Sequence, residues 1–185
     1  MKQLILCFSV ICLCQVIQAQ NNRRFDNIEY KSALKFNLLS PIIGAIAVNY
    51  ENKLNNDASF IASASYFTGQ IDNTTEPIRG FVASLEYRFY TGNEPMRGLY
   101  LQPYARYQYF KDIQTKTDEL SVPGLGLLGG YQYIFAKRIV FDMNFGPAYN
   151  FGTLTSPQNT YGNSDLKPMF RGYWMRGGIS VGFLF

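Results

Sequence analysis

The final stretch of the chain, Tyr173 to Phe185, restricts the fold more than any other segment. Successive side chains of a β-strand point to opposite faces. One face of this stretch would carry Tyr173, Met175, Gly177, Ile179, Val181, Phe183 and Phe185, and the other Trp174, Arg176, Gly178, Ser180, Gly182 and Leu184. An apolar face with aromatic ends, opposite a small and polar face, is typical of a transmembrane barrel strand. Because a spanning sheet cannot leave an edge in hydrocarbon, the rest of the chain must supply strands that close it.

Seven other segments show the same alternation of apolar with small or polar residues. They are Lys31–Leu39, Gly44–Lys53, Ser59–Thr68, Arg79–Tyr90, Gly98–Phe110, Gly124–Phe135 and Ile139–Phe151. With the final stretch they make an even set, and we predict an all-β fold, an eight-stranded antiparallel transmembrane β-barrel of outer-membrane type over residues 31–185. Pro103 removes a backbone donor inside one predicted strand, so a bulge or one missing hydrogen bond is expected there.

The connections between the predicted strands alternate in length. Those before the third, fifth and seventh strands are short, whereas Gly69–Ile78, Lys111–Pro123 and Gly152–Gly172 are longer and polar. Outer-membrane barrels have short periplasmic turns and longer outer loops, so this asymmetry predicts that both chain termini lie on the periplasmic side. The first connection, Ser40–Ile43, is short where a long one is expected.

The N-terminus has the pattern of a secretory signal peptide, predicted over residues 1–19. Lys2 precedes an apolar run from Leu4 to Leu13, and Ile17-Gln18-Ala19 provides a cleavage site. The apolar run is too short to cross a bilayer as a helix. Residues 20–30 are polar and aperiodic, which predicts a flexible periplasmic leader.

All cysteines, Cys7, Cys12 and Cys14, lie in the segment that would be removed. The mature chain therefore has no thiol for a disulfide, a metal site or a nucleophile. Cys14 suggests a lipoprotein, but Leu13 stands where such signals need a small residue, and this disfavours lipid attachment.

Alternation alone also fits a soluble eight-stranded barrel of lipocalin type, in which the apolar face points inward. A soluble exterior would carry far more Lys and Glu than the polar faces here, which mix Gly and Ser with few charges. Aromatic residues make up 16% of the chain and suit the girdles at membrane interfaces. Removal of Lys2 lowers the formal charge from +4 to +3, a spread-out balance that does not predict nucleic-acid binding.

Several short motifs carry a resemblance to a known family. They are Lys35-Phe36-Asn37-Leu38-Leu39-Ser40-Pro41, Asn49-Tyr50-Glu51, Leu85-Glu86-Tyr87-Arg88-Phe89-Tyr90 and Gly98-Leu99-Tyr100 leading to Pro103-Tyr104-Ala105-Arg106-Tyr107. With these motifs the chain resembles an uncharacterised family of small Gram-negative outer-membrane barrels and, more broadly, barrels of the OmpA and OmpX type. The resemblance implies that the C-terminal positions Ile179, Val181, Phe183 and Phe185 are a signal for the barrel-assembly machinery, and that outer-membrane lipids surround the barrel.

The sequence argues against catalysis. The chain has no histidine, whereas small-barrel lipid A acylases and deacylases, which it resembles in size, use a histidine base or triad. A lipid-modifying enzyme is therefore a distant alternative. The 13 Asp and Glu show no calcium-loop spacing, so we predict no catalytic residue, metal or cofactor. Gly124-Leu125-Gly126-Leu127-Leu128-Gly129 matches a dinucleotide fingerprint in letters only, because it lies in a predicted strand; glycines that relieve crowding in the lumen are the better interpretation.

The inward faces of the predicted strands contain one set of charged residues. They are Lys35, Glu51, Lys53, Glu86, Arg88, Arg106, Asp142 and Arg176. A small barrel is filled by side chains, and an unpaired buried charge is very costly, so these residues are expected to form ion pairs that fix strand register. The alternative is that exchange of pairs opens a narrow gated channel.

The outer loops offer a second surface. Tyr161, Phe170 and Arg171 are candidate contacts for a surface ligand, because aromatic residues and arginine dominate interface hot spots, although solvated loops are the simpler interpretation. We therefore predict a monomeric, non-enzymatic barrel of the bacterial outer membrane with an envelope-structural or surface-binding role.

Overall fold

The computed structural model describes residues 30–69, 78–92, 96–112, 119–155 and 171–185. The predicted signal peptide and all but the last residue of the predicted leader lie outside these ranges. The strands are β1 (Ser32–Asn37), β2 (Ala45–Lys53), β3 (Ala58–Gly69), β4 (Ile78–Tyr90), β5 (Gly98–Asp112), β6 (Glu119–Phe135), β7 (Ile139–Phe151), β8 (Thr153–Thr155) and β9 (Arg171–Leu184). Among the described residues, no helix is long and apolar enough to cross a membrane.

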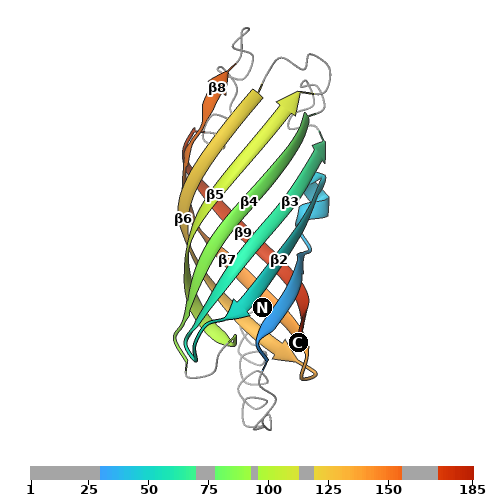
Figure 1. The fold of residues 1–185 in the computed structure, drawn as a ribbon, viewed down its shortest axis with the longest axis vertical. Coiled ribbons are helices and arrows are strands. Elements are labelled where there is room, and N and C mark those ends of the chain that lie inside the picture. The colour runs from blue at the N-terminus through green and yellow to red at the C-terminus, as the bar shows by residue number, and fades with distance from the viewer. Residues whose placement is uncertain (1–29, 70–77, 93–95, 113–118, 156–170) are drawn as a thin grey trace, which may run out of the picture.

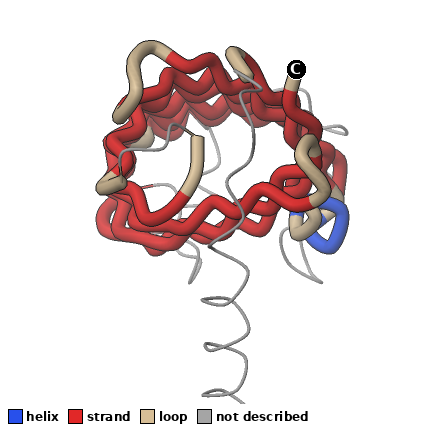
Figure 2. The backbone as a smooth tube through the Cα atoms, turned by 90° about the horizontal axis from the view of Figure 1, so that it is seen from below, coloured by secondary structure: helices blue, strands red, loops and turns tan. Residues whose placement is uncertain are grey.

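The strands form one closed antiparallel sheet. Each strand from β1 to β6 pairs with the next along the chain, and β9 pairs with both β7 and β1. The short β8 follows β7 and pairs with β6, so eight strands encircle the barrel (Figures 1 and 2). The predicted fold class is confirmed.

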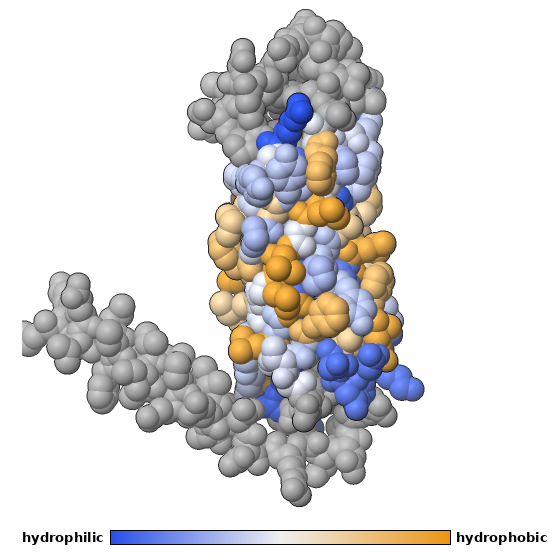
Figure 3. Space-filling model, turned by 90° about the vertical axis from the view of Figure 1, so that its left-hand side faces the viewer, coloured by the Kyte–Doolittle hydropathy of each residue, from blue (hydrophilic) through white to orange (hydrophobic). Residues whose placement is uncertain are grey.

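Burial alternates along the strands as the sequence pattern predicts. In β7, for example, Phe141, Met143 and Phe145 are exposed on the outside, whereas Val140 and Asp142 are buried in the lumen. Figure 3 shows apolar side chains gathered around the middle of the wall and hydrophilic ones towards its ends. Because the large apolar side chains lie outside and the charges inside, the arrangement is that of a membrane barrel rather than a lipocalin-type barrel.

The two ends of the barrel differ. β1 begins and β9 ends at the same end, here called the terminal end (Figure 1). The turns at this end are short: β6 and β7 are joined by Ala136, Lys137 and Arg138, as predicted. Ala136 and Lys137 have φ values of 48° and 68°, the left-handed conformation of a tight hairpin turn. At the opposite end, here called the loop end, β3, β5 and β8 end and β4, β6 and β9 begin.

The first strand is shorter than the predicted Lys31–Leu39. β1 ends at Asn37, whose side-chain Oδ1 accepts the backbone N–H of Leu39 at 2.8 Å. The chain then forms a 3-10 helix, Ser40–Ile43, with a proline in its first turn. It closes at Gly44, where φ is 72°, a conformation that glycine adopts without strain. Local hydrogen bonds to Asn37 thus compete with continued pairing to β9.

Two loop predictions were wrong. Lys111–Pro123 was expected to be one loop, but β5 extends to Asp112 and β6 begins at Glu119. The inward Phe110, Leu120 and Val122 are buried together, so the apolar alternation continues beyond the predicted strand ends. The predicted loop Gly152–Gly172 likewise contains β8 near its start, and its last two residues belong to β9.

Pro103 interrupts the ladder between β4 and β5 without changing its register. Glu86 pairs with Tyr104 on one side of the interruption and Phe89 with Leu101 on the other, so no residue is inserted. One of the two predicted outcomes, a gap in the hydrogen bonding, is therefore confirmed, and a bulge is excluded.

Candidate functional site in the barrel lumen

Four of the inward charges form one buried group near the terminal end, here called the four-charge group. Lys35 of β1 lies 2.7 Å from Glu51 of β2 and 2.7 Å from Asp142 of β7, measured from Nζ to Oε2 and to Oδ2. Arg88 of β4 contacts the same carboxylates, at 3.5 Å for Glu51 and 2.9 Å for Asp142. No side chain of the group is more than 2% exposed. Two cations and two carboxylates thus neutralise one another out of water.

Neutral side chains complete the hydrogen bonding of the four-charge group. Gln132 of β6 accepts hydrogen bonds from Lys35 and from Arg88. Tyr90 and Ser59 donate to Glu51 at 2.6 and 2.5 Å, and Tyr100 donates to Asp142. The Arg88 guanidinium also stacks on the Tyr100 ring, 3.7 Å from its centroid. Such saturation offsets the desolvation cost of burying ions.

A glycine allows Lys35 to reach Asp142. β9 lies between β1 and β7, and Gly182 is the β9 partner of both Lys35 and Val140. A Cβ at Gly182 would lie 2.5 Å from Lys35 Cγ and 2.3 Å from the Leu34 carbonyl oxygen. The lysine side chain therefore crosses β9 over Gly182, which has no side chain to obstruct it.

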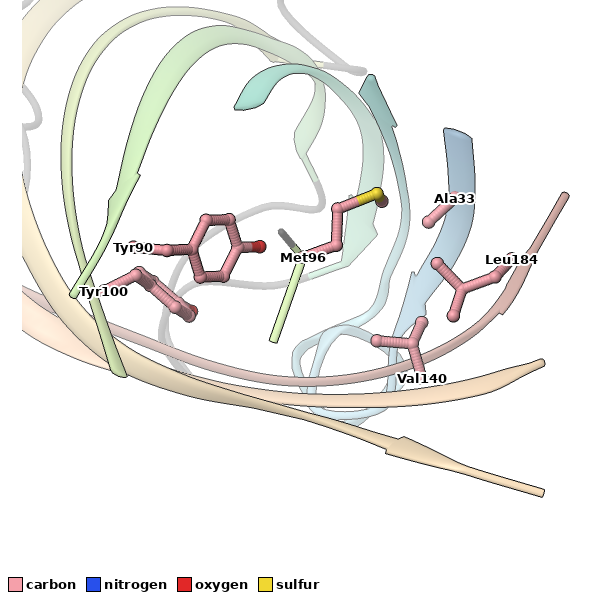
Figure 4. Close-up of a cluster of buried hydrophobic side chains, with 6 residues drawn as sticks. All are labelled: Ala33, Tyr90, Met96, Tyr100, Val140 and Leu184. Atoms are coloured by element: carbon pink, nitrogen blue, oxygen red, sulfur yellow. The ribbon is translucent and has the colours of Figure 1, made fainter. Parts of the chain in front are cut away.

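Apolar residues fill the lumen beside the four-charge group at the terminal end. The cluster consists of Ala33, Tyr90, Met96, Tyr100, Val140 and Leu184 (Figure 4). Met96 comes from the connection between β4 and β5 and is only 1% exposed. The two tyrosines belong to both assemblies, with rings in the cluster and hydroxyls on the carboxylates. The terminal end of the lumen is therefore packed with side chains.

A second ion pair lies towards the loop end. Arg176 of β9 donates from Nη2 to Glu86 Oε1 of β4 at 2.9 Å. Ser84 donates to the same carboxylate at 2.6 Å. Gln102 joins the two groups, because its Oε1 accepts Arg88 Nε at 2.7 Å and its Nε2 donates to Glu86.

A polar cavity of about 20 Å³ lies between the two charge groups. Its lining is made of Lys35, Asn37, Asn49, Ile61, Glu86, Arg88, Gln102, Asp142, Asn144, Arg176, Gly177, Gly178 and Ser180. A cavity of this size holds about one water molecule, which is far less than an open pore requires.

Arg106 of β5 does not join either charge group through a hydrogen bond. Its Nη2 donates to Asn150 of β7 at 3.0 Å. Two glycines of β6 make room here: a Cβ at Gly124 would lie 2.6 Å from Asn150 Oδ1, and one at Gly126 would lie 2.5 Å from the Tyr104 ring. This supports the interpretation of these glycines as relief of lumen crowding. Lys53 ends β2 and is half-buried, two residues beyond Glu51.

The other predicted site residues lie elsewhere. Phe183 and Phe185, from the proposed assembly signal, are exposed near the terminal end, and Ile179 and Val181 share their outward face on β9. Of the outer-loop candidates, Arg171 is exposed at the start of β9, and Tyr161 and Phe170 lie outside the described residues. Within the described ranges, no three His, Cys, Asp or Glu side chains are arranged to hold a metal ion.

A comparison with protein families matches residues 5–162 to the family described as "Protein of unknown function (DUF3575)". That range includes every strand up to β8 and all the lumen charges except Arg176. The chain belongs to the DUF3575 family. A comparison with curated proteins found no match.

A solved structure gives the same fold for this DUF3575 protein. The N-terminal β-barrel domain of Pseudomonas aeruginosa OprF is similar over 85% of this chain and 98% of the OprF domain, with a TM-score of 0.51 and 16% sequence identity. At that identity the likeness concerns the eight-stranded barrel fold and not the residues in the lumen.

Sequence reasoning missed the neutral members of the lumen groups. Gln102, Gln132, Tyr90 and Tyr100 stand at inward positions of their strands, but nothing in the sequence indicated which charges they would contact. The available signal was their residue type, since an amide or hydroxyl facing a barrel interior needs a partner. The pairing itself depends on register between strands far apart in sequence.

Proposed function

We propose that this DUF3575 protein is a closed, non-enzymatic barrel of the bacterial outer membrane with an envelope-structural or surface-binding role. The observation that carries the proposal is the filled lumen. Lys35, Glu51, Arg88 and Asp142 bridge four strands with exposed fractions of 0–2%, and an apolar cluster packs beside them. A lumen tied together in this way supports a rigid wall and leaves the outside of the barrel and its loop end as the surfaces that meet other molecules.

The outer face of the wall and the difference between the two ends support the proposed position in the membrane. Apolar side chains such as Leu85, Leu125 and Phe145 are 55–61% exposed on the outside of the wall, where hydrocarbon would cover them. The short turns and the C-terminus at the terminal end favour a periplasmic location for that end. The loop end then faces outward, where a surface ligand would bind.

The chemistry of the lumen supports a non-enzymatic role. The chain has no histidine, and its cysteines lie within the predicted signal peptide. The buried carboxylates Glu51, Glu86 and Asp142 each accept hydrogen bonds from cations and neutral donors. These contacts suit structural ion pairs rather than a general base open to substrate.

One observation favours the second candidate, a narrow gated channel. The cavity between the charge groups is lined by Glu86, Arg176 and Asp142, whose rearrangement would form a polar path. Conduction would require the buried groups on both sides of the cavity to separate, which costs several kcal/mol for each uncompensated charge.

The proposed role is tested by deletion and complementation in the host. Cells without the protein are expected to show weakened envelope integrity, measured as detergent sensitivity, and the full chain is expected to restore it from the outer-membrane fraction. A matched variant has segments 113–118 and 156–170 replaced by short Gly-Ser turns. If the role is structural, this variant should still restore envelope integrity. If the role is surface binding, it should not. Recovery of the protein outside the outer-membrane fraction would overturn the proposal.

A further inference from the structure

The loop half of the lumen contains buried donors without partners. Four such atoms are Tyr104 Oη, Arg106 Nε and Gln108 Nε2 on β5 and Arg176 Nη1 on β9. They make up all but one of the buried side-chain polar atoms that lack a hydrogen bond in the described part of the chain, the other being Tyr30 Oη. Buried polar groups are nearly always satisfied in folded proteins, so this concentration needs an explanation.

The charges in the same region do not balance. Apart from Lys53, which is half-buried where β2 ends, the described strands direct four cations into the lumen, Lys35, Arg88, Arg106 and Arg176, against the three carboxylates of Glu51, Glu86 and Asp142, an excess of one positive charge. The four-charge group is neutral by itself. The surplus therefore lies with Arg106 and Arg176, which have the single carboxylate of Glu86 between them.

Tyr104 relates the positions of Arg106 and Arg176. The Arg176 guanidinium stacks on Tyr104, 4.5 Å from the ring centroid, and Arg106 follows Tyr104 by two positions on the same face of β5. Each arginine already holds one acceptor, Asn150 Oδ1 for Arg106 and Glu86 Oε1 for Arg176. Each keeps a further N–H free for another acceptor.

We propose that Arg106 and Arg176 form a binding site for a small oxyanion, a phosphate or carboxylate group, in the loop half of the lumen. One negative charge would neutralise the surplus cation, and its oxygen atoms would accept the free N–H groups of both arginines. Guanidinium groups bind such oxyanions through short, charge-assisted hydrogen bonds. Tyr104 and Gln108 would supply neutral donors.

The strand pairing of the barrel wall beside Arg176 is relevant to the route by which the anion enters. The cavity lined by Arg176 also reaches Gly177 and Gly178 of β9 and Asn37 of β1. β1 ends at Asn37, opposite Ser180, so β9 from Arg171 to Gly178 has a strand partner on the β7 side only. A free anion would enter from the loop end, whereas a lipid headgroup would enter through this side of the wall.

The test uses Trp174, the single tryptophan of the chain, which lies two residues from Arg176. The refolded mature protein is titrated with inorganic phosphate against sodium chloride of equal ionic strength, and Trp174 fluorescence is followed. A saturable change specific to phosphate is expected. Arg106→Gln should weaken binding about tenfold or more, because a charged hydrogen-bond donor is lost. Arg106 has a neutral partner, so this variant leaves no carboxylate unpaired and its folding is checked by heat-shifted gel mobility.

Two further variants sharpen the result. Glu86→Gln removes the competing carboxylate and should strengthen phosphate binding, whereas Arg138→Gln, at an exposed turn of the terminal end, should leave it unchanged. A response to vesicles with anionic lipid, absent with zwitterionic lipid and with free phosphate, would identify a headgroup as the oxyanion. The proposal is overturned if neither probe gives a saturable response, or if Arg106→Gln binds as tightly as the wild type.

Discussion

Lys35 on β1 and Asp142 on β7 lie 2.7 Å apart, from Nζ to Oδ2, although β9 separates their strands. The contact spans two strand spacings and ties together the first and the seventh strands of the barrel. It also crosses the point where the sheet closes through the pairing of β1 with β9. An ion pair of this kind links the closure of the barrel to the filling of its lumen.

Removal of the lysine charge should strongly destabilise the barrel. Lys35→Met leaves Glu51 and Asp142 with Arg88 as the remaining cation of the group, and breaking a buried pair in this way costs about 3–5 kcal/mol. Lys137→Met, at an exposed turn, should cost less than about 0.5 kcal/mol. Urea unfolding in lipid vesicles measures both. A loss at Lys35 no larger than at Lys137 would show that the charges are not paired.

The coupling between the two residues can be measured separately. If Lys35 and Asp142 stabilise each other, Lys35→Met combined with Asp142→Asn should cost less than the sum of the single changes, by about 0.5–3 kcal/mol. Additive losses in the same unfolding assay would mean that each residue acts independently.

Gly182 should not tolerate a side chain. A Cβ there would lie 2.3 Å from the Leu34 carbonyl oxygen, which is backbone and cannot rotate away. We expect Gly182→Ala to destabilise the barrel by about 1–3 kcal/mol, the typical cost of overpacking. Gly129→Ala is the matched control, because a Cβ at Gly129 meets nothing within 4 Å. Equal unfolding midpoints for the two variants would contradict the close crossing of Lys35 over β9.

The outer face of β7 tests the membrane position. Phe145 stands midway between Ile139 and Phe151 on the exposed face, and Phe151 stands at the loop end. Phe145→Lys should cost about 2–4 kcal/mol if it lies near the bilayer midplane, whereas Phe151→Lys should cost about 0–1 kcal/mol near the interface. Both start from phenylalanine on one strand, so depth is the main difference. Similar losses in vesicle unfolding would argue against a surrounding bilayer.

Much of the barrel wall was predictable because the alternation of apolar with small or polar residues is a local feature of the sequence. The alternation in Ile139–Phe151 and Tyr173–Phe185 gave the facing of each side chain without knowledge of any neighbour. The strand ends were less predictable. β1 stops early because Asn37 bonds to Leu39 and Ser40, and β5 and β6 run on because Phe110, Leu120 and Val122 pack together.

The set of lumen charges was also predictable in outline, but its grouping was not. Lys35, Glu51, Arg88 and Asp142 come from four strands, and their contact depends on register across the whole sheet. The different surroundings of Arg106, which bonds to Asn150 instead of a carboxylate, could not be read from the sequence pattern.

Single-channel conductance of the refolded mature chain in a planar bilayer tests the closed barrel most directly, with folding confirmed by heat-shifted gel mobility. The filled lumen predicts a folded protein that gives no openings. Discrete openings that change in Glu86→Gln or Arg176→Gln would contradict the closed barrel and make the lumen charges a gate.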